Sequence, residues 1–336
     1  MTARPDTADE PPTESDPEEV ATMLLSRVAE NIYWAGRYLE RAEATARLVK
    51  THTELYVDLP LSAGVGWAPL LVVTGSHDAY QAAYAHARED EVVAFLVTDN
   101  SHTGSVVASI GQARSNLRAT RAMLPRRTWE IVNELHHHVA DTGHRAVDRR
   151  TRLSWNEDLI RRCHLVSGSI NATMSRDDAF SFLEIGRMIE RADMTTRVLD
   201  VQAGILMGDD GHLDPYADLT WMAVLSSVGA EQMFRRAMGG AVNGPDAVRF
   251  LLRDTSFPRS VEHCLIEVSR WLLELPHQER PMAGCAAVQR SLDAVELDAL
   301  DADGLHDFVD ELQVGFAELH ELLTGTYFLS EELAAT

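Results

Sequence analysis

The sequence predicts an all-α fold, an irregular helical bundle made of two tandem homologous helical repeats. Two observations favour helices. Aromatic residues make up only 7% of the chain, and no stretch sustains the alternation of apolar and polar residues typical of half-buried strands. A third observation indicates a duplication. The segment "GRYLERAEATAR" at 36–47 returns as "GRMIERADMTTR" at 186–197, with seven of the twelve positions identical.

Two further pairs of segments match in the same order and at nearly the same spacing. Their offsets are 154 and 155 residues, and they join 67–80 to 221–234 and 95–106 to 250–261. Collinear matches with small drift are what a tandem duplication followed by loop insertions leaves behind. We therefore expect a first repeat at 21–150 and a second at 151–336, which can pack as one globular unit.

Residues 1–20 precede the first repeat. They contain four prolines and seven carboxylates against a single arginine, a composition too polar to join a core. They do not follow the order of a signal peptide, in which a basic stretch precedes an apolar one. The sequence predicts a disordered acidic tail at 1–20 and a soluble, cytoplasmic protein.

The first repeat is expected to be mostly helical. One helix should run from about 17 to 56, because apolar or small residues recur three or four apart without an internal proline. A second helix starts near Trp67, within an uncharged run whose prolines and glycines argue against a membrane span. A third covers about 105–124 and stops at Pro125, where "RRTWEIVNELHHH" begins another.

The second repeat is expected to follow the same order. Its copy of the charged segment lies on a helix, and a later helix opens at Ser260 and stops at Pro276. A last amphipathic helix is predicted at 304–329.

Charge and composition exclude several classes of function. The formal net charge of −22 repels polyanions, so nucleic-acid binding is not expected. Three widely spaced cysteines form no CxxC pair and indicate reduced core residues. Glu134 and His137 alone cannot build a carboxylate-bridged dimetal site. For that reason the sequence predicts no metal site, and it predicts no cofactor because it contains no nucleotide-binding loop and no nucleophile motif.

The duplicated charged segment supplies the best candidate site. On a helical wheel its charged residues fall on the face opposite the apolar residues. Arg37 and Arg41 are like charges one turn apart, which is locally unfavourable, so partners outside the helix are expected. The candidate binding residues on this face are Glu30, Arg37, Glu40 and Arg41 in the first repeat and Arg187, Glu190 and Arg191 in the second.

Three interpretations of the charged face are open. It could form a buried salt-bridge network between helices, bind an anionic ligand or substrate, or simply face solvent. If the two repeats pack through these helices, two glutamates and four arginines meet in one polar seam.

A second candidate is the turn that carries Asp254 and Arg259. Ser260 is expected to cap a helix, and Arg259 would then lie beside a helix N-terminus, where anions are favoured. Asp254 and Ser260 also suit ordinary turn and cap roles. The first repeat has Thr103 and Gly104 in place of the proline and arginine, so only one repeat can use Arg259.

Three segments resemble a known family over nearly the whole chain after the acidic tail. They are "LSRVAENIYWAGRYLERAEATARLV", "FLEIGRMIERADMTTRVLD" and "VRFLLRDTSFPRSVEHCL", and they are similar to motifs of the bacterial alpha-E family. The resemblance implies a tandem helical protein whose ER motifs are Glu40-Arg41 and Glu190-Arg191. It also implies an association with circularly permuted ATP-grasp ligases, in a system for peptide synthesis or modification.

Three hypotheses of function follow. The chain could be an accessory component that binds an ATP-grasp ligase partner or presents a peptide or amino-acid substrate, which predicts an apolar patch or a groove between the repeats. It could be an enzyme in which Glu40 or Glu190 is a general base and the nearby arginines hold an anion. It could also be a scaffold whose ER motifs are buried ion pairs.

Overall fold

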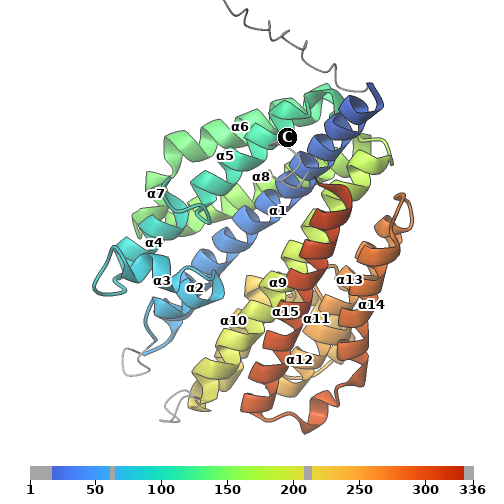
Figure 1. Ribbon diagram of the computed structural model, residues 1–336. Coiled ribbons are helices and arrows are strands. Elements are labelled where there is room, and N and C mark those ends of the chain that lie inside the picture. The colour runs from blue at the N-terminus through green and yellow to red at the C-terminus, as the bar shows by residue number, and fades with distance from the viewer. Residues whose placement is uncertain (1–16, 61–64, 208–213, 329–336) are drawn as a thin grey trace, which may run out of the picture.

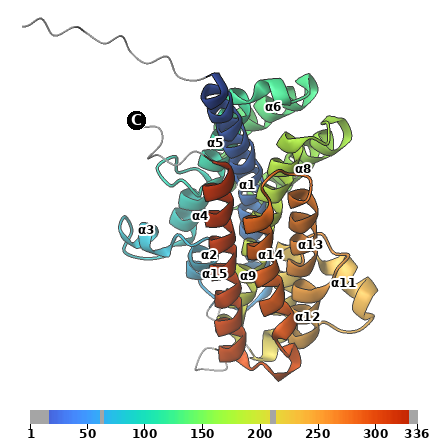
Figure 2. The same cartoon turned by 45° about the vertical axis from the view of Figure 1, so that its right-hand side comes forward.

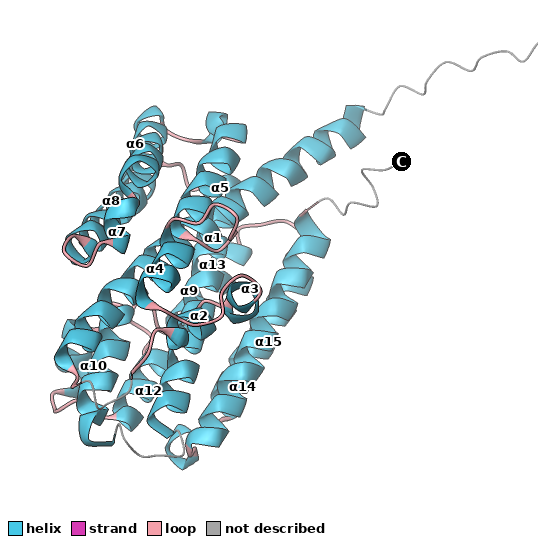
Figure 3. Ribbon diagram, turned by 90° about the vertical axis from the view of Figure 1, so that its left-hand side faces the viewer, coloured by secondary structure: helices cyan, strands magenta, loops and turns pink. Residues whose placement is uncertain are grey.

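The computed structural model describes residues 17–60, 65–207 and 214–328, and every regular element in them is helical (Figure 3). The elements in chain order are α1 (Pro17–Asp58), α2 (Ala68–Val73), α3 (His77–Gln81), α4 (Glu89–Val97), α5 (Val106–Ala119), η2 (Arg121–Met123), α6 (Arg126–Thr142), α7 (His144–Val147), α8 (Arg152–Thr173), α9 (Asp178–Met207), η3 (Asp214–Tyr216), α10 (Ala217–Ser227), α11 (Glu231–Met238), α12 (Gly244–Arg253), α13 (Val261–Leu272), α14 (Glu279–Ala294), η4 (Leu297–Ala299) and α15 (Ala302–Tyr327).

Two long helices, α1 and α9, pack against each other at the centre of the molecule (Figure 1). Helices α5 and α8 pack on α1, and α6 covers both of them. On the other side α13 and α15 pack on α9, with α14 beside them (Figure 2). The halves also interlock, because α2 packs on α9 while α10 packs on α1. The central pair is thus enclosed by helices from both parts of the chain.

Helix α1 is buried on two faces, although its helical wheel suggests that only the apolar face is covered. Ile32, Leu39 and Val49 lie in the apolar core, but Glu40 on the charged face is also buried, at 4% exposure. The interpretation of this face as solvent-exposed is therefore wrong. A wheel separates apolar from charged residues, but it cannot tell that a second charged helix covers the polar side.

The long predicted helices have their counterparts in the structure. The helix expected at 17–56 is α1, so residues 17–20 belong to a helix and not to the predicted tail; residues 1–16 lie outside the described residues. The helix expected from Ser260 is α13, and the Ser260 hydroxyl accepts a hydrogen bond from the backbone N–H of His263. The final predicted helix is α15.

Matched segments of the two proposed repeats have similar local structure. Gly75 after α2 and Gly229 after α10 both have positive φ, 62° and 66°. Ser105 caps α5 as Ser260 caps α13. Helix α8, which follows the boundary expected at residue 150, packs on α1 and α6 of the preceding part of the chain. The division into two repeats at that residue stays a prediction.

No helix among the described residues combines the length and the apolar character needed to cross a membrane. The uncharged run near Trp67 contains α2, a helix of six residues that packs on α9. Prolines and glycines in that run limit the helix to less than two turns.

Candidate functional site: a reciprocal ion-pair clasp

The charged segments of α1 and α9 face each other where the two helices cross. Both carry the pattern G-R-x-x-E-R, in which the arginines and the glutamate project from the same side of the helix. Gly36 and Gly186 have no side chain at the contact, and each lies directly against the backbone of the opposite helix. The small residues bring the two charged faces within reach of one another.

Glu190 of α9 is held by two arginines of α1. Its Oε2 accepts a hydrogen bond of 2.7 Å from Arg37 Nε, and its Oε1 and Oε2 accept from Arg41 Nε and Nη2 at 2.5 and 2.9 Å. The carboxylate is 1% exposed. Burial alone would raise the pKa of Glu190, but the charges and hydrogen bonds of Arg41 and Arg37 outweigh it and lower the pKa to about 2. Glu190 is therefore a buried anion at neutral pH.

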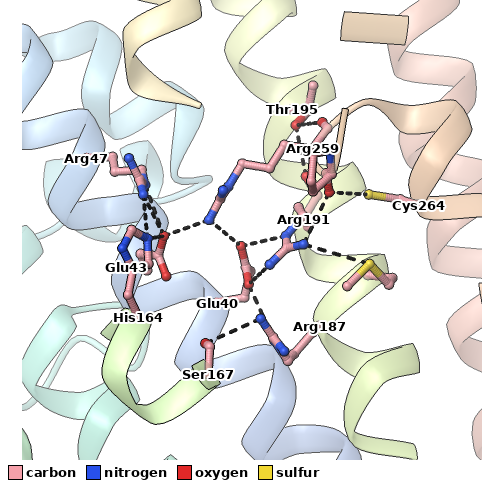
Figure 4. Close-up of polar contacts among 12 residues, drawn as sticks. Glu40, Glu43, Arg47, His164, Ser167, Arg187, Arg191, Thr195, Arg259 and Cys264 are labelled. Atoms are coloured by element: carbon pink, nitrogen blue, oxygen red, sulfur yellow. Dashed lines mark hydrogen bonds and ion pairs between the residues drawn. The ribbon is translucent and has the colours of Figure 1, made fainter. Parts of the chain in front are cut away.

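Glu40 of α1 makes the reverse pairing with α9 (Figure 4). Arg191 Nε and Nη2 each donate to one carboxylate oxygen at 2.8 Å, in a bidentate arrangement. Arg187 Nε lies 3.7 Å from Oε2, and Arg259 Nη2 donates to Oε1 at 3.3 Å. Burial acts to raise the pKa of Glu40, and the charges of Arg191 and Arg259 reverse this and lower it.

We call these six residues the ER clasp: Arg37, Glu40, Arg41, Arg187, Glu190 and Arg191. Each glutamate is neutralised by arginines of the other helix, so the pairs cannot form within either helix alone. Removing one partner from such a cluster leaves a buried charge uncompensated, which is far more costly than losing a surface pair. Both carboxylates are saturated with donors, and neither has the raised pKa that a general base working near pH 7 needs.

An aromatic layer covers the α1 end of the ER clasp. The guanidinium of Arg37 lies 5.3 Å from the centre of the Trp34 ring, and that of Arg41 lies 5.7 Å from the Tyr38 ring. Such contacts favour the cation once water is removed from it. The Tyr33 hydroxyl is 2.9 Å from His320 Nδ1 of α15. This layer supports the clasp from outside.

Glu43 and His164 extend the cluster, and the sequence pattern did not identify them. Glu43, one turn after Glu40, accepts hydrogen bonds from Arg47 at 2.9 and 3.0 Å and from Arg259 at 2.6 Å. His164 Nε2 of α8 lies 3.1 Å from the same carboxylate. Burial acts to raise the pKa of Glu43, and the hydrogen bond from His164 with the charge of Arg259 lowers it. The spacing of Glu43 and Arg47 was readable in the sequence; the contact with His164 was not.

Arg259 joins the cluster, whereas Asp254 does not. The guanidinium of Arg259 points to Glu40 and Glu43 instead of staying beside the start of α13, so the predicted anion site at that N-terminus is replaced by an internal ion pair. Asp254 Oδ1 accepts hydrogen bonds from the backbone N–H groups of Ser256 and Phe257. Asp254 therefore shapes the turn that presents Arg259.

Glu30 lies away from the ER clasp. It is half-buried on α1, ten residues before Glu40, and a helix advances about 15 Å over ten residues. The carboxylate nearer to Arg187 is Glu184, one turn earlier on α9, which accepts a hydrogen bond of 2.7 Å from Arg187 Nη1. We predicted Glu30 to belong with the other charged residues because it has a similar angle on the helical wheel. The wheel does not show that it lies almost three turns away along the helix axis.

Potential metal-ligand side chains converge at one place in the described part of the chain. Atoms of Asp200, His306 and Asp310 lie within 4.8 Å of one another at the surface. The hydrogen bond and charge of Asp200 raise the pKa of His306, which favours the protonated imidazole that cannot bind a metal. The described cysteines, Cys163, Cys264 and Cys285, are buried and free. This donor set gives no reason to infer a metal centre.

These features define an all-helical protein organised around a buried, reciprocal pairing of two ER motifs. Residues 24–328 match the profile of the Alpha-E family, described as a predicted alpha-helical domain with a conserved ER motif. The chain belongs to this family.

Similar proteins are found in mycobacteria. Uncharacterised proteins of Mycobacterium bovis and Mycobacterium tuberculosis are 26% identical to the chain over 336 aligned positions. The alignment covers 92% of this chain but 36% of each relative, so the chain spans about a third of their length. No solved structure matches it significantly.

Proposed function

We propose that this chain is a non-catalytic accessory subunit that binds a partner polypeptide, and that the ER clasp holds the two halves of the subunit together. The observation that carries this proposal is an apolar groove of about 730 Å³ at the end of the bundle. It is lined by Val28 and Ala29 of α1, by Phe182 of α9, and by Pro276 and Tyr327. Both halves of the chain thus contribute to the groove, which has the size of a ligand or peptide site.

The rim of the groove suggests the chemistry of its occupant. Asp177 and Asp178 line it and are exposed. The Tyr327 hydroxyl, also in the lining, is buried without a hydrogen-bond partner in the described structure. Burial and the charges of Glu279 and Asp178 raise the pKa of Tyr327 to about 12, so it stays a donor. An apolar floor with an acidic rim fits a partner segment that combines aliphatic and basic side chains.

The longer relatives support a partnership. In them the part similar to this chain is joined to a further two thirds of polypeptide. A domain that is fused to other domains in one protein often works beside a separate partner in another. The resemblance to the alpha-E family supports one class of partner, a circularly permuted ATP-grasp ligase that activates a carboxylate. In this proposal the chain docks the ligase or presents its peptide or amino-acid substrate.

The alternatives have less support. An enzyme using Glu40 or Glu190 as a general base needs an accessible carboxylate, but both are buried, fully paired and of lowered pKa. Ligand binding at the ER clasp would require an anion to displace a glutamate from its arginines. The ER pairs serve as structural struts in this proposal, which therefore combines the scaffold interpretation with partner binding at the groove.

The test is co-purification with an ATP-grasp ligase encoded beside this protein, followed by ATP turnover of each alone and of both together. We expect a stable complex or turnover only in combination. Met123→Glu places a charge in the groove lining and should weaken the complex at least tenfold. Leu165→Glu on α8 is the matched control, because Leu165 is also an exposed apolar residue but lies outside the groove. Equal loss with both variants, or no association at all, would overturn the proposal.

A further inference from the structure

A second cavity, of about 350 Å³, lies beside the ER clasp between α1, α8 and the turn that precedes α11. Its lining includes three side chains that carry a positive charge, in a chain whose net charge is −22: Arg47 and Lys50 come from α1 and Arg161 from α8, beside the imidazole of His164. We call it the basic pocket. We infer that the basic pocket binds the oxyanion of a small ligand, a carboxylate or a phosphate, independently of partner docking at the apolar groove.

Arg47 is fixed in the wall of the basic pocket by the buried Glu43. The pairing uses Nε and Nη2, while Nη1 lies against Gly229. A Cβ atom at Gly229 would come within 3.1 Å of Nη1, so the glycine leaves room for the guanidinium in the wall, where the Arg47 side chain keeps 14% of its surface exposed. A preorganised cation of this kind loses little side-chain entropy when it binds an anion.

His164 is held in the same way. Its Nε2 lies 3.1 Å from Glu43 Oε1, and the side chain is 54% exposed. Nε2 also lies 2.9 Å from Arg47 Nη2, and these two contacts leave Nδ1 for a ligand. Lys50 Nζ lies 2.7 Å from Glu54 and 3.9 Å from Glu157, and the ammonium can turn towards an anion by rotation of its flexible stem. The pocket thus combines two fixed groups with the flexible side chain of Lys50 and with Arg161, which pairs with Asp158 of its own helix and is 75% exposed.

The corresponding surface of α9 carries a different set of charged residues. Arg197 lies against Gly75 as Arg47 lies against Gly229, with a Cβ at Gly75 3.2 Å from Nη1. Three residues later, however, α1 carries Lys50 and α9 carries Asp200. Around Asp200 gather His306 and Asp310. The same backbone frame therefore accepts Lys50 on one side and Asp200 on the other, so the lysine is not a requirement of the fold and is available for a ligand.

Two acidic residues of the lining set a limit on the ligand. Glu157 and Glu231 also line the pocket, and their charge opposes a large polyanion. A small molecule with a single oxyanion suits this lining better than a polyanion does. The cavity volume is likewise that of a small metabolite.

Titration calorimetry with the full-length protein tests this inference, using inorganic phosphate and acetate separately at low ionic strength. We expect saturable binding of at least one of them, which identifies the preferred oxyanion. Lys50→Gln and Arg161→Gln should each weaken binding about tenfold, as expected when a charged contact is lost. Lys50→Asp, which copies the α9 residue, should abolish it.

Arg127→Gln provides the control, because Arg127 is an exposed arginine on α6, outside the pocket. The Arg127→Gln variant should bind the anion with the same affinity as the original protein. The inference is overturned if neither anion binds with a dissociation constant below about 10 mM, or if Lys50→Gln and Arg161→Gln, checked for an unchanged circular dichroism spectrum, bind as tightly as the control.

Discussion

Gly36 and Gly186 occupy reciprocal positions in the crossing of α1 and α9. A methyl group on Gly36 would lie 2.3 Å from the carbonyl oxygen of Leu183, and one on Gly186 would lie 2.2 Å from that of Tyr33. Both distances are far inside van der Waals contact with backbone atoms, which cannot rotate away. The distance between the two helices, and with it the geometry of the ER clasp, depends on these two glycines.

Gly36→Ala should therefore destabilise the protein by about 3 kcal/mol or more, since the helices must separate to accommodate the methyl group. The measurement is urea unfolding followed by circular dichroism. Gly168→Ala on α8 is the control, because a Cβ there meets nothing within 4 Å; it should stabilise the helix by about 0.5–1 kcal/mol. Equal effects of the two substitutions would contradict the close approach.

Glu190→Gln should cost about 3–5 kcal/mol in the free energy of unfolding, because Arg37 and Arg41 then keep partly buried charges without a counterion. The comparison is Glu54→Gln, which removes a partner of Lys50 at the surface and should cost less than about 1 kcal/mol. If Glu190→Gln lowers the free energy of unfolding by less than about 1 kcal/mol, the ER clasp does not stabilise the fold.

The ER clasp also predicts how stability responds to acid. The pKa of Glu190 is about 2 in the folded protein, against an ordinary value of 4.5. A lowered carboxyl pKa contributes stability that is fully present above 4.5 and is lost as the pH falls towards 2, here about 3 kcal/mol. Unfolding free energies measured between pH 6 and pH 2.5 should decrease below pH 4.5. In Glu190→Gln this part of the decrease should be absent.

His52 gives a separate response at higher pH. It is buried, its Nε2 donates to the Gly66 carbonyl oxygen at 2.9 Å, and burial lowers its pKa from 6.5 to about 4. Because the unfolded chain takes up the proton first, stability from the neutral imidazole is complete above pH 6.5 and is lost as the pH falls towards 4. An NMR titration of the His52 ring should give a pKa near 4; a value near 6.5 would refute this.

The helices could be predicted because their apolar residues recur with the helical period, as in α1 and α15. Helix α8 was missed for a physical reason. Its buried side includes Arg152 and Asn156, so polar residues occupy positions where the pattern requires apolar ones. Arg152 is buried because Glu89 accepts its Nη1–H at 2.7 Å and the Ala146 carbonyl its Nε–H at 2.9 Å. One partner is a carboxylate 63 residues away and the other is a backbone carbonyl. A pattern of apolar residues along the helix indicates neither of them.

The site was predictable in part. Like charges one turn apart on both charged helices indicated outside partners, but the sequence could not tell another helix from a ligand. It also could not show that Arg259 reaches Glu43, 216 residues away, or that His164 does so from α8. Contacts of this kind depend on how the helices pack against one another. That packing cannot be read from a single sequence.

In the terms used for oligomers, the α1–α9 crossing is isologous: the pair Arg41–Glu190 on one side is matched by Arg191–Glu40 on the other. Such a contact normally joins two separate subunits, whereas here residues 174–177 between α8 and α9 are the covalent link. A chain cut within this link should therefore behave as a heterodimer whose two fragments elute together. Neither fragment could bury its own glutamate without the arginines of the other.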